Sequence, residues 1–127
     1  MALDKQMAKI VLVVDDSPSI RELVKLTLKC AGFSVIEAVD GLDALSKLDG
    51  QKINLIVSDL NMPNMDGIDL VKKIKAHPNY KFTPVLMLTA EADETMKVDG
   101  KSAGIKAWLI KPFKPEALLS AIFKLAW

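Results

Sequence analysis

The sequence of 127 residues contains almost none of the residues that build disulfides or soft-ligand metal sites. It has one cysteine, Cys30, and one histidine, His77. One cysteine excludes an intrachain disulfide and a cysteine-based zinc site, and one histidine excludes any site that needs two imidazoles. Chemistry in this chain must therefore rely on carboxylates, hydroxyls and amines. We expect Cys30 itself to be a small, partly buried residue near the end of a helix.

The sequence also lacks an excess of charge and any long apolar run. Lys and Arg number 17 against 16 Asp and Glu, which leaves a net charge of +1. A near-neutral chain has no global field for holding nucleic acid or an anionic membrane. No apolar run approaches the roughly 20 residues of a membrane-spanning helix. We therefore expect a cytoplasmic protein without nucleic acid or membrane partners, in which residues 1–8 are a disordered leader and residues 9–127 form one domain.

Apolar residues make up half of the sequence and alternate between two patterns. Short continuous runs with the pattern of buried strands cover residues 10–14, 34–38, 53–58, 83–88 and 107–110. Segments with helical spacing follow them, at residues 18–31, 41–49, 66–77, 91–103 and from 115 onward. In the second of these helices we expect Leu42, Leu45 and Leu48 to face the core. Strands alternating with helices predict an α/β fold, in which helices cover both faces of a parallel sheet.

The predicted helix at residues 91–103 differs from the others because it has few apolar residues. Its charged side chains outnumber its apolar anchors, and Gly100 inside it costs about 1 kcal/mol relative to alanine. Two interpretations stay open: a solvated surface helix, or a weakly held element that can shift, as a switch requires.

Polar residues stand at the end of four predicted strands. Asp15 and Asp16 follow the first strand, Asp59 ends the third, Thr89 follows the fourth and Lys111 follows the fifth. Ligand sites in open parallel sheets form beyond the carboxyl ends of the strands. We therefore expect three carboxylates, one hydroxyl and one ammonium to meet at the same edge of the sheet.

Three clustered carboxylates repel one another and need a compensating charge. Hard oxygen ligands suit Mg²⁺, which commonly binds one or two carboxylates together with a phosphate. With Lys111 as a second cation, the set predicts phosphoryl transfer: Asp59 attacks phosphorus, Mg²⁺ and Lys111 neutralise the phosphoryl oxygens, and Thr89 donates a hydrogen bond.

At these residues the chain resembles the receiver domains of two-component response regulators, most closely the stand-alone CheY-like type. The matching segments are VVDDSPSIR (13–21), EAVDGLDAL (37–45), SDLNMPNMDG (58–67), MLTAEA (87–92) and WLIKPF (108–113). The resemblance implies a flavodoxin-like (βα)5 fold with five parallel strands in the order 2-1-3-4-5 and helices on both faces.

The resemblance also implies roles for individual residues. Asp59 is the implied phosphoacceptor, Lys111 contacts the phosphoryl group, and the Lys111–Pro112 peptide bond is expected to be cis. The chain is then not an enzyme in the usual sense, but it catalyses its own phosphorylation and dephosphorylation. The implied magnesium ligands are the side chains of Asp16 and Asp59, the backbone carbonyl of Asn61 and, through water, Asp15.

The resemblance also implies roles for two further pairs of residues. Thr89 and the aromatic residue on the fifth strand form the family's switch, and that aromatic is Trp108 where Tyr or Phe is commoner. Trp108 is either a moving switch residue or a fixed packing residue, and both readings stay open. Asn61 and Glu91 occupy the positions that tune dephosphorylation. Because both are polar and could orient water, we expect a short-lived acyl phosphate.

The implied function is that of a single-domain response regulator, acting as a monomer in chemotaxis. Its partners would be a CheA-like sensor histidine kinase, a downstream protein such as the flagellar motor switch, and a phosphatase, with output through the fourth helix, fifth strand and fifth helix. A phosphate sink and a relay regulator of pili or cell division are alternatives. A small Mg²⁺-dependent phosphatase is the alternative from another class, although Asn61 stands where such enzymes carry a second aspartate.

Overall fold

The computed structural model describes residues 9–90, 99 and 101–125 of the chain. The expected leader at residues 1–8 and most of the expected helix at 91–103 lie outside the described residues; of that helix, Asp99 and residues 101–103 are described, and they are helical. Along the chain, the helices and strands are β1 (Ile10–Val14), α2 (Pro18–Cys30), β2 (Ser34–Ala38), α3 (Gly41–Lys47), β3 (Leu55–Asp59), α4 (Gly67–Ala76), β4 (Val85–Thr89), β5 (Ala107–Ile110) and α6 (Pro115–Leu125).

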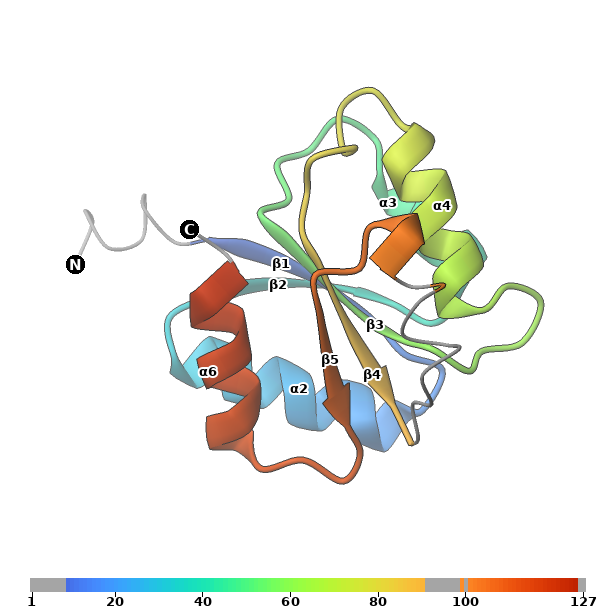
Figure 1. Cartoon of the computed structure of the whole chain (residues 1–127). Coiled ribbons are helices and arrows are strands. Elements are labelled where there is room, and N and C mark those ends of the chain that lie inside the picture. Colours follow the sequence, from blue (N-terminus) through green and yellow to red (C-terminus); the bar gives the residue numbers. More distant parts are fainter. Residues whose placement is uncertain (1–8, 91–98, 100, 126–127) are drawn as a thin grey trace.

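The strands form one five-stranded sheet in the order β2-β1-β3-β4-β5, and every pairing is parallel. This confirms the predicted fold and strand order. Figure 1 shows the twisted sheet at the centre, with α2 and α6 on one face and α3 and α4 on the other. None of the helices described has the length and apolar character that crossing a membrane requires.

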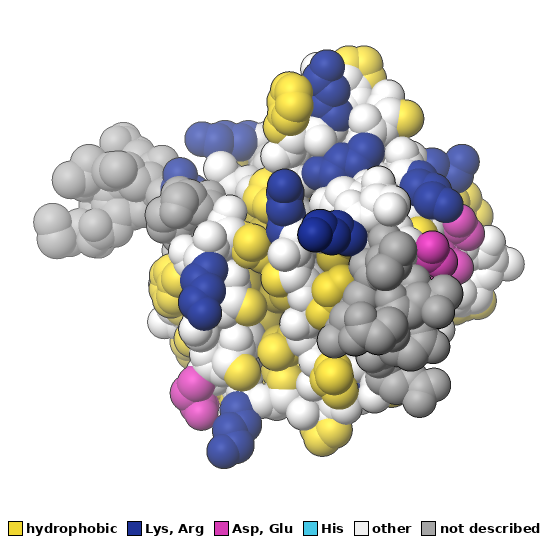
Figure 2. All heavy atoms as spheres, in the orientation of Figure 1, with side chains coloured by type: hydrophobic (Ala, Val, Ile, Leu, Met, Phe, Trp, Pro, Cys, Tyr) yellow, Lys and Arg dark blue, Asp and Glu magenta, His cyan; other side chains and the backbone are white. Residues whose placement is uncertain are grey.

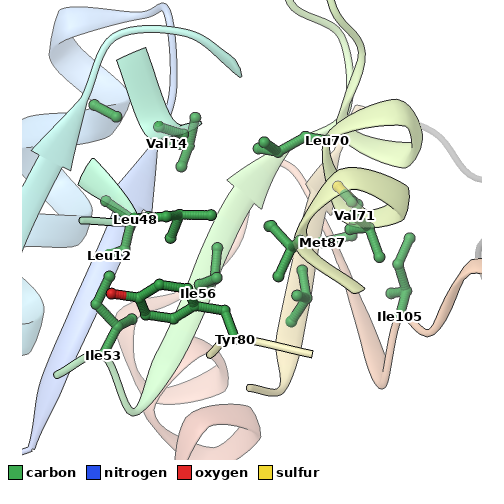
Figure 3. Packing of buried hydrophobic residues seen from close by; sticks show 14 of the residues in the cluster. Leu12, Val14, Leu48, Ile53, Ile56, Leu70, Val71, Tyr80, Met87 and Ile105 are labelled. Atoms are coloured by element: carbon green, nitrogen blue, oxygen red, sulfur yellow. The ribbon is translucent and has the colours of Figure 1, made fainter. Parts of the chain in front are cut away.

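Each face of the sheet carries its own hydrophobic core, because alternate strand residues point to opposite faces. Val13 and Val57 belong to the core beneath α2 and α6, whereas their neighbours Val14 and Ile56 belong to the core beneath α3 and α4. Figure 3 shows the second core, where Leu12 and Ile56 of the sheet lie among Leu48, Ile53 and Tyr80 from the connecting segments. With both faces covered, the central strands β1, β3 and β4 are buried almost throughout, and their charged side chains are left to the strand ends.

Three helices that follow strands begin at a polar side chain. Ser17, Asp40 and Asp66 are the N-caps of α2, α3 and α4, and each accepts a hydrogen bond from a backbone amide of the first turn. Pro18 at the first position of α2 adds a preset helical φ. The caps fix where each chain segment turns back, and this holds the residues after β1 and β3 at one edge of the sheet.

The structure corrects several local predictions. Of the three leucines expected to face the core near α3, Leu48 is buried and Leu45 packs against the core, but Leu42 is 57% exposed, and Gly41 and Ala44 are buried in α3 instead. Cys30 is exposed rather than partly buried. Strand β4 begins at Val85 rather than at residue 83, since Pro84 has no amide hydrogen and only accepts a bond, from the amide of Ile56.

Gly67, the first residue of α4, lies against the backbone at the end of β3. A Cβ atom added there would be 2.6 Å from the carbonyl oxygen of Asp59 and 2.6 Å from Sδ of Met87. We expect Gly67→Ala to lower the free energy of unfolding by about 1–3 kcal/mol, because the backbone oxygen cannot move away without disturbing the strand. Urea unfolding followed by circular dichroism measures this change.

The matched control is Gly41→Ala at the first residue of α3. There the added Cβ meets the side chain of Met65, whose Sδ lies at 2.8 Å and can move to another rotamer. The helical preference of alanine over glycine, about 1 kcal/mol, offsets this smaller clash. Equal losses of stability in the two variants would contradict the assignment of the Gly67 effect to the Asp59 backbone.

Candidate functional site

Three carboxylates meet at the carboxyl ends of β1 and β3. Asp15 and Asp16 follow β1 directly, and Asp59 is the last residue of β3. Oxygen atoms from all three lie within 4.8 Å of one another. Asp15 is fully buried and Asp59 is 6% exposed, while Asp16 is exposed to solvent. The juxtaposition follows from neighbouring parallel strands that end at the same level of the sheet.

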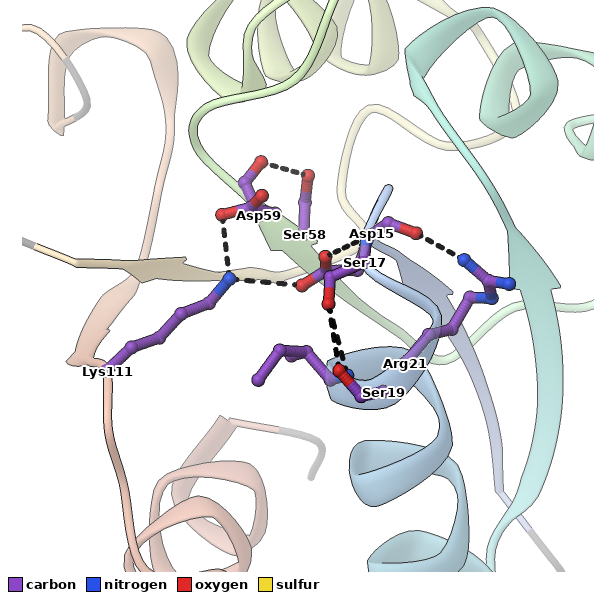
Figure 4. A network of polar contacts seen from close by, with 8 residues as sticks. Asp15, Ser17, Ser19, Arg21, Ser58, Asp59 and Lys111 are labelled. Carbon is purple, nitrogen blue, oxygen red and sulfur yellow. Dashed lines mark hydrogen bonds and ion pairs between the residues drawn. The ribbon is translucent and has the colours of Figure 1, made fainter.

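Lys111, just beyond β5, extends its ammonium group into this cluster. Its Nζ lies 3.1 Å from Oδ1 of Asp59 and 3.2 Å from Oδ2 of Asp15, which Figure 4 shows as two converging ion pairs. The backbone amide of Lys111 donates to the carbonyl of Thr89 at 2.7 Å, and the Lys111–Pro112 peptide bond is cis. The lysine thereby bridges the ends of β1 and β3 from the neighbouring edge of the sheet.

Burial and charge act against each other in this cluster. Burial raises the pKa of the Asp59 carboxyl above its ordinary value, and the nearby charge of Asp15 adds to this, while the hydrogen bond from Lys111 opposes it. Burial would lower the pKa of Lys111, but its bond to Asp59 and the two carboxylate charges outweigh this and raise the pKa. The site therefore attracts positive charge, and the single ammonium of Lys111 does not neutralise all three carboxylates.

Backbone and side-chain contacts that the sequence analysis missed hold Asp15 in place. The backbone amide of Ser17 donates to Oδ1 of Asp15 at 2.8 Å, and Nη1 of Arg21 donates to the carbonyl of Asp15 at 2.7 Å. Arg21 is held in turn by Glu37 of β2, with Nε 3.3 Å from Oε1. The sequence did contain a signal for this contact. Arg21 lies in the first turn of the helix that follows Asp15 and Asp16, and that turn faces back toward the strand end (Figure 4).

The donor set fits a hard divalent cation. All three side-chain donors are carboxylate oxygens, which Mg²⁺ prefers, and one of the three residues remains open to solvent. Asn61, predicted to offer its backbone carbonyl, is exposed two residues beyond Asp59. Glu91, predicted with Asn61 to tune dephosphorylation, lies outside the described residues.

Thr89 and Trp108 lie on the same face of the sheet. Thr89 is fully buried at the end of β4, and Trp108 on β5 is paired in register with Met87, two residues before Thr89. Trp108 is half-buried, packs against the core beneath α4, and lines a hollow together with Ile105 and Lys106. Thr89 at the buried strand end and Trp108 beside a surface hollow therefore lie on one face of β4 and β5, so a movement of Thr89 can change the packing of Trp108.

Comparisons with known proteins agree with this geometry. The family model described as the response regulator receiver domain matches residues 11–123. The Vibrio cholerae chemotaxis protein CheY-3 is 40% identical over 124 residues, which are 97% of this chain and 94% of that protein. The structure of V. cholerae chemotaxis protein CheY4 superposes with a TM-score of 0.90 at 46% identity, covering 93% of this chain and 98% of that one.

A further solved structure is similar in fold at lower sequence identity. It is the receiver domain of a sensor histidine kinase from Pseudomonas aeruginosa PAO1, with a TM-score of 0.85, 27% identity, and coverage of 94% of this chain and 98% of that chain. In that protein a magnesium ion is coordinated in the active site cleft.

Proposed function

The chain belongs to the response regulator receiver domain family and is thus a response regulator, and from this premise we propose that Asp59 is the residue that accepts the phosphoryl group. The observation that carries the proposal is the position of Lys111, whose ammonium lies 3.1 Å from Asp59 within a cluster of three carboxylates. An ammonium at this distance can neutralise phosphoryl oxygens on the aspartate without moving far.

In the proposed reaction, a carboxylate oxygen of Asp59 attacks the phosphorus of a phosphohistidine on the kinase. The new P–O bond forms as the P–N bond breaks, and the imidazole leaves with the bonding electron pair and takes up a proton. Because burial raises the pKa of Asp59, the nucleophile depends on Lys111 to favour its ionised form. Thr89 would donate its hydroxyl to a phosphoryl oxygen from the end of β4.

We propose that Asp15, Asp16, Asp59 and the carbonyl of Asn61 hold Mg²⁺, with Asp15 acting through water. When bound, the ion supplies positive charge to the phosphoryl oxygens that Lys111 alone does not provide. The carboxylate donor set supports this assignment, as does the magnesium ion in the similar P. aeruginosa receiver domain.

The proposed output is a protein contact in chemotaxis. The support is the similarity to chemotaxis proteins of V. cholerae, together with the position of Thr89 and Trp108 on one face of β4 and β5. A sensor histidine kinase would phosphorylate the chain. A downstream target such as the flagellar motor switch would bind the face formed by the predicted helix at residues 91–103, β5 and α6, and a phosphatase would shorten the signal. We propose a monomer inside the cytoplasm.

The proposed function is tested by the stoichiometry of phosphorylation. We expect acetyl phosphate with Mg²⁺ to label each chain with at most one phosphoryl group, which intact-protein mass spectrometry detects. We expect no sustained turnover of p-nitrophenyl phosphate, because the site lacks a second aspartate at Asn61 to act as general acid. Continuous release of p-nitrophenol, lost when Asp59 is replaced, would instead support the phosphatase alternative.

Trp108 should report phosphorylation by its fluorescence. The measurement uses Trp127→Phe, which removes the second tryptophan, at a residue outside the described part of the chain. If Thr89 draws toward the phosphoryl group, the space beside Trp108 changes, and we expect its emission to change in intensity when Mg²⁺ and beryllofluoride are added together. A spectrum unchanged by saturating beryllofluoride would mean that Trp108 is a fixed packing residue.

A further inference from the structure

Three adjoining hollows lie at the end of the fold away from the carboxylates. Their volumes are about 540, 440 and 310 Å³. Lys75 lines the first and third hollows, and Gly104 and Lys106 line the second and third, so the three are continuous. We call this region the lysine surface and define it by Lys72, Lys75, Lys81, Phe82, Lys101 and Lys106.

The lysine surface concentrates positive charge on a chain that is nearly neutral. Among the described residues that line the hollows, five are lysines and one, Asp99, is acidic, whereas the whole sequence has a net charge of +1. In Figure 2, Lys and Arg side chains gather over the part of this face occupied by α4 and the segment leading into β5, and the visible acidic side chains lie toward its edges. Burial lowers the pKa of Lys75 below its ordinary value, and the charge of Lys106 lowers it further.

An exposed aromatic side chain, Phe82, lines the third hollow beside three of these lysines. Phe82 is 87% exposed, and the ammonium of Lys81 lies 5.2 Å from the centre of its ring. The loop that carries Phe82 is held on both sides. The Tyr80 hydroxyl donates to the carbonyl of Gln51 at 2.7 Å, and Nζ of Lys75 donates to the carbonyl of Thr83 at 2.7 Å. A fixed loop that presents a large apolar ring to solvent resembles the anchor residues of protein interfaces.

The lysine surface is separate from the phosphoryl site. Phe82 and Lys106 precede β4 and β5, at the amino ends of the strands, whereas Asp15 and Asp59 stand at the carboxyl ends. Because all strands are parallel, these ends lie on opposite sides of the molecule. A partner on the lysine surface therefore leaves Asp59 accessible.

We propose that the lysine surface binds an acidic protein segment that carries an apolar residue. Its carboxylates would pair with the crowded ammonium groups, relieving their mutual repulsion, and its apolar side chain would cover the Phe82 ring. A protein segment fits better than a polyanion, because one aromatic ring beside concave hollows offers no row of stacking platforms for bases. The contact does not depend on the chemistry of Asp59. It adjoins the proposed output face at residues 101–106 and Trp108, and it differs from that face because it includes α4 and the loop that carries Phe82.

The test selects peptides from a random display library on the wild-type chain and depletes them on a Lys81→Glu/Lys106→Glu variant. Both lysines are exposed, so the fold should tolerate the change. We expect the selected peptides to be enriched in Asp and Glu with at least one Leu, Phe or Trp. In fluorescence anisotropy, their affinity should fall at least tenfold for the Lys81→Glu/Lys106→Glu variant and at least threefold for Phe82→Ser.

A matched control carries the same charge change elsewhere, as Lys29→Glu/Lys124→Glu at exposed positions on α2 and α6, and should change the affinity less than twofold. Asp59→Asn should also bind normally, which separates this proposal from the proposed function. Equal weakening by both charge pairs, or selected peptides without acidic residues, would overturn the proposal. So would binding of single-stranded RNA or phosphatidylserine vesicles that the Lys81→Glu/Lys106→Glu variant abolishes while peptide binding persists.

Discussion

Replacing Asp59 with asparagine is expected to abolish phosphoryl incorporation from acetyl phosphate in magnesium buffer. Asparagine keeps the shape of the side chain but has no anionic oxygen to attack phosphorus, and it also removes a proposed metal ligand. Intact-protein mass spectrometry should therefore find the added phosphoryl mass on the wild type and none on the variant. No other change in the chain is expected to have as large an effect on this reaction.

The control is Asp49→Asn, which removes the same charge from an exposed loop. It should be phosphorylated at the wild-type rate. Residual labelling of Asp59→Asn at a level near that of the wild type would show that another residue accepts the phosphoryl group. Asp16 is the residue to examine next in that case, because its carboxylate belongs to the same cluster and is open to solvent.

The Asp59→Asn variant should also be more stable than the wild type at neutral pH when divalent cations are removed by EDTA. Burial raises the pKa of Asp59, so the fold favours the protonated carboxyl. The stability that this group contributes is therefore greatest at low pH and is lost as the pH rises through the raised pKa. Asparagine stays neutral throughout, so its advantage should be present at pH 7 and disappear as the pH falls below that pKa.

The meeting of the carboxylates was predictable because it depends on strand order alone. Once the sequence shows five alternating strands and helices, parallel pairing places Asp16, Asp59 and Lys111 at one edge, whatever the side-chain packing. The prediction for the core-facing side chains near α3 was right for Leu45 and Leu48 and wrong for Leu42, because it depended on local periodicity. In a helix of only seven residues, periodicity does not identify the edges of the buried side. Gly41 lies against Met65, and the next residue, Leu42, is exposed.

Contacts between residues far apart in the sequence were also beyond prediction. The bonds from Arg21 to Asp15 and to Glu37 depend on how α2 packs on β1 and β2, which no local pattern specifies. The lysine surface likewise joins a helix, a loop and the segment before β5, and in the sequence its lysines look like ordinary solvated charges. These lysines differ from other solvated lysines only because the fold brings them close together, which the composition does not reveal.

Replacing Lys111 with methionine is expected to destabilise the chain by roughly 2–4 kcal/mol at pH 7 in EDTA, because removing one partner of a buried ion pair typically costs about 3–5 kcal/mol and this site is partly open to solvent. Methionine preserves much of the side-chain volume but leaves the carboxylates of Asp15 and Asp59 without their ammonium. The midpoint of urea unfolding measures the loss. Labelling by acetyl phosphate should also slow by about 10²-fold, as when an electrostatic donor is removed from other active sites.

Lys114→Met, three residues farther along at an exposed position, is the matched control and should stay within about 0.5 kcal/mol of the wild type. The pH dependence distinguishes lost charge pairing from lost packing. The raised pKa of Lys111 means that its contribution is complete at neutral pH and is lost only above that pKa. The defect of Lys111→Met should therefore be full at pH 7 and shrink in acid as the carboxylates are protonated, and adding Asp59→Asn should restore part of the stability. A defect that persists unchanged in acid and in the double variant would assign Lys111 a packing role and remove the electrostatic basis for phosphoryl transfer at this site.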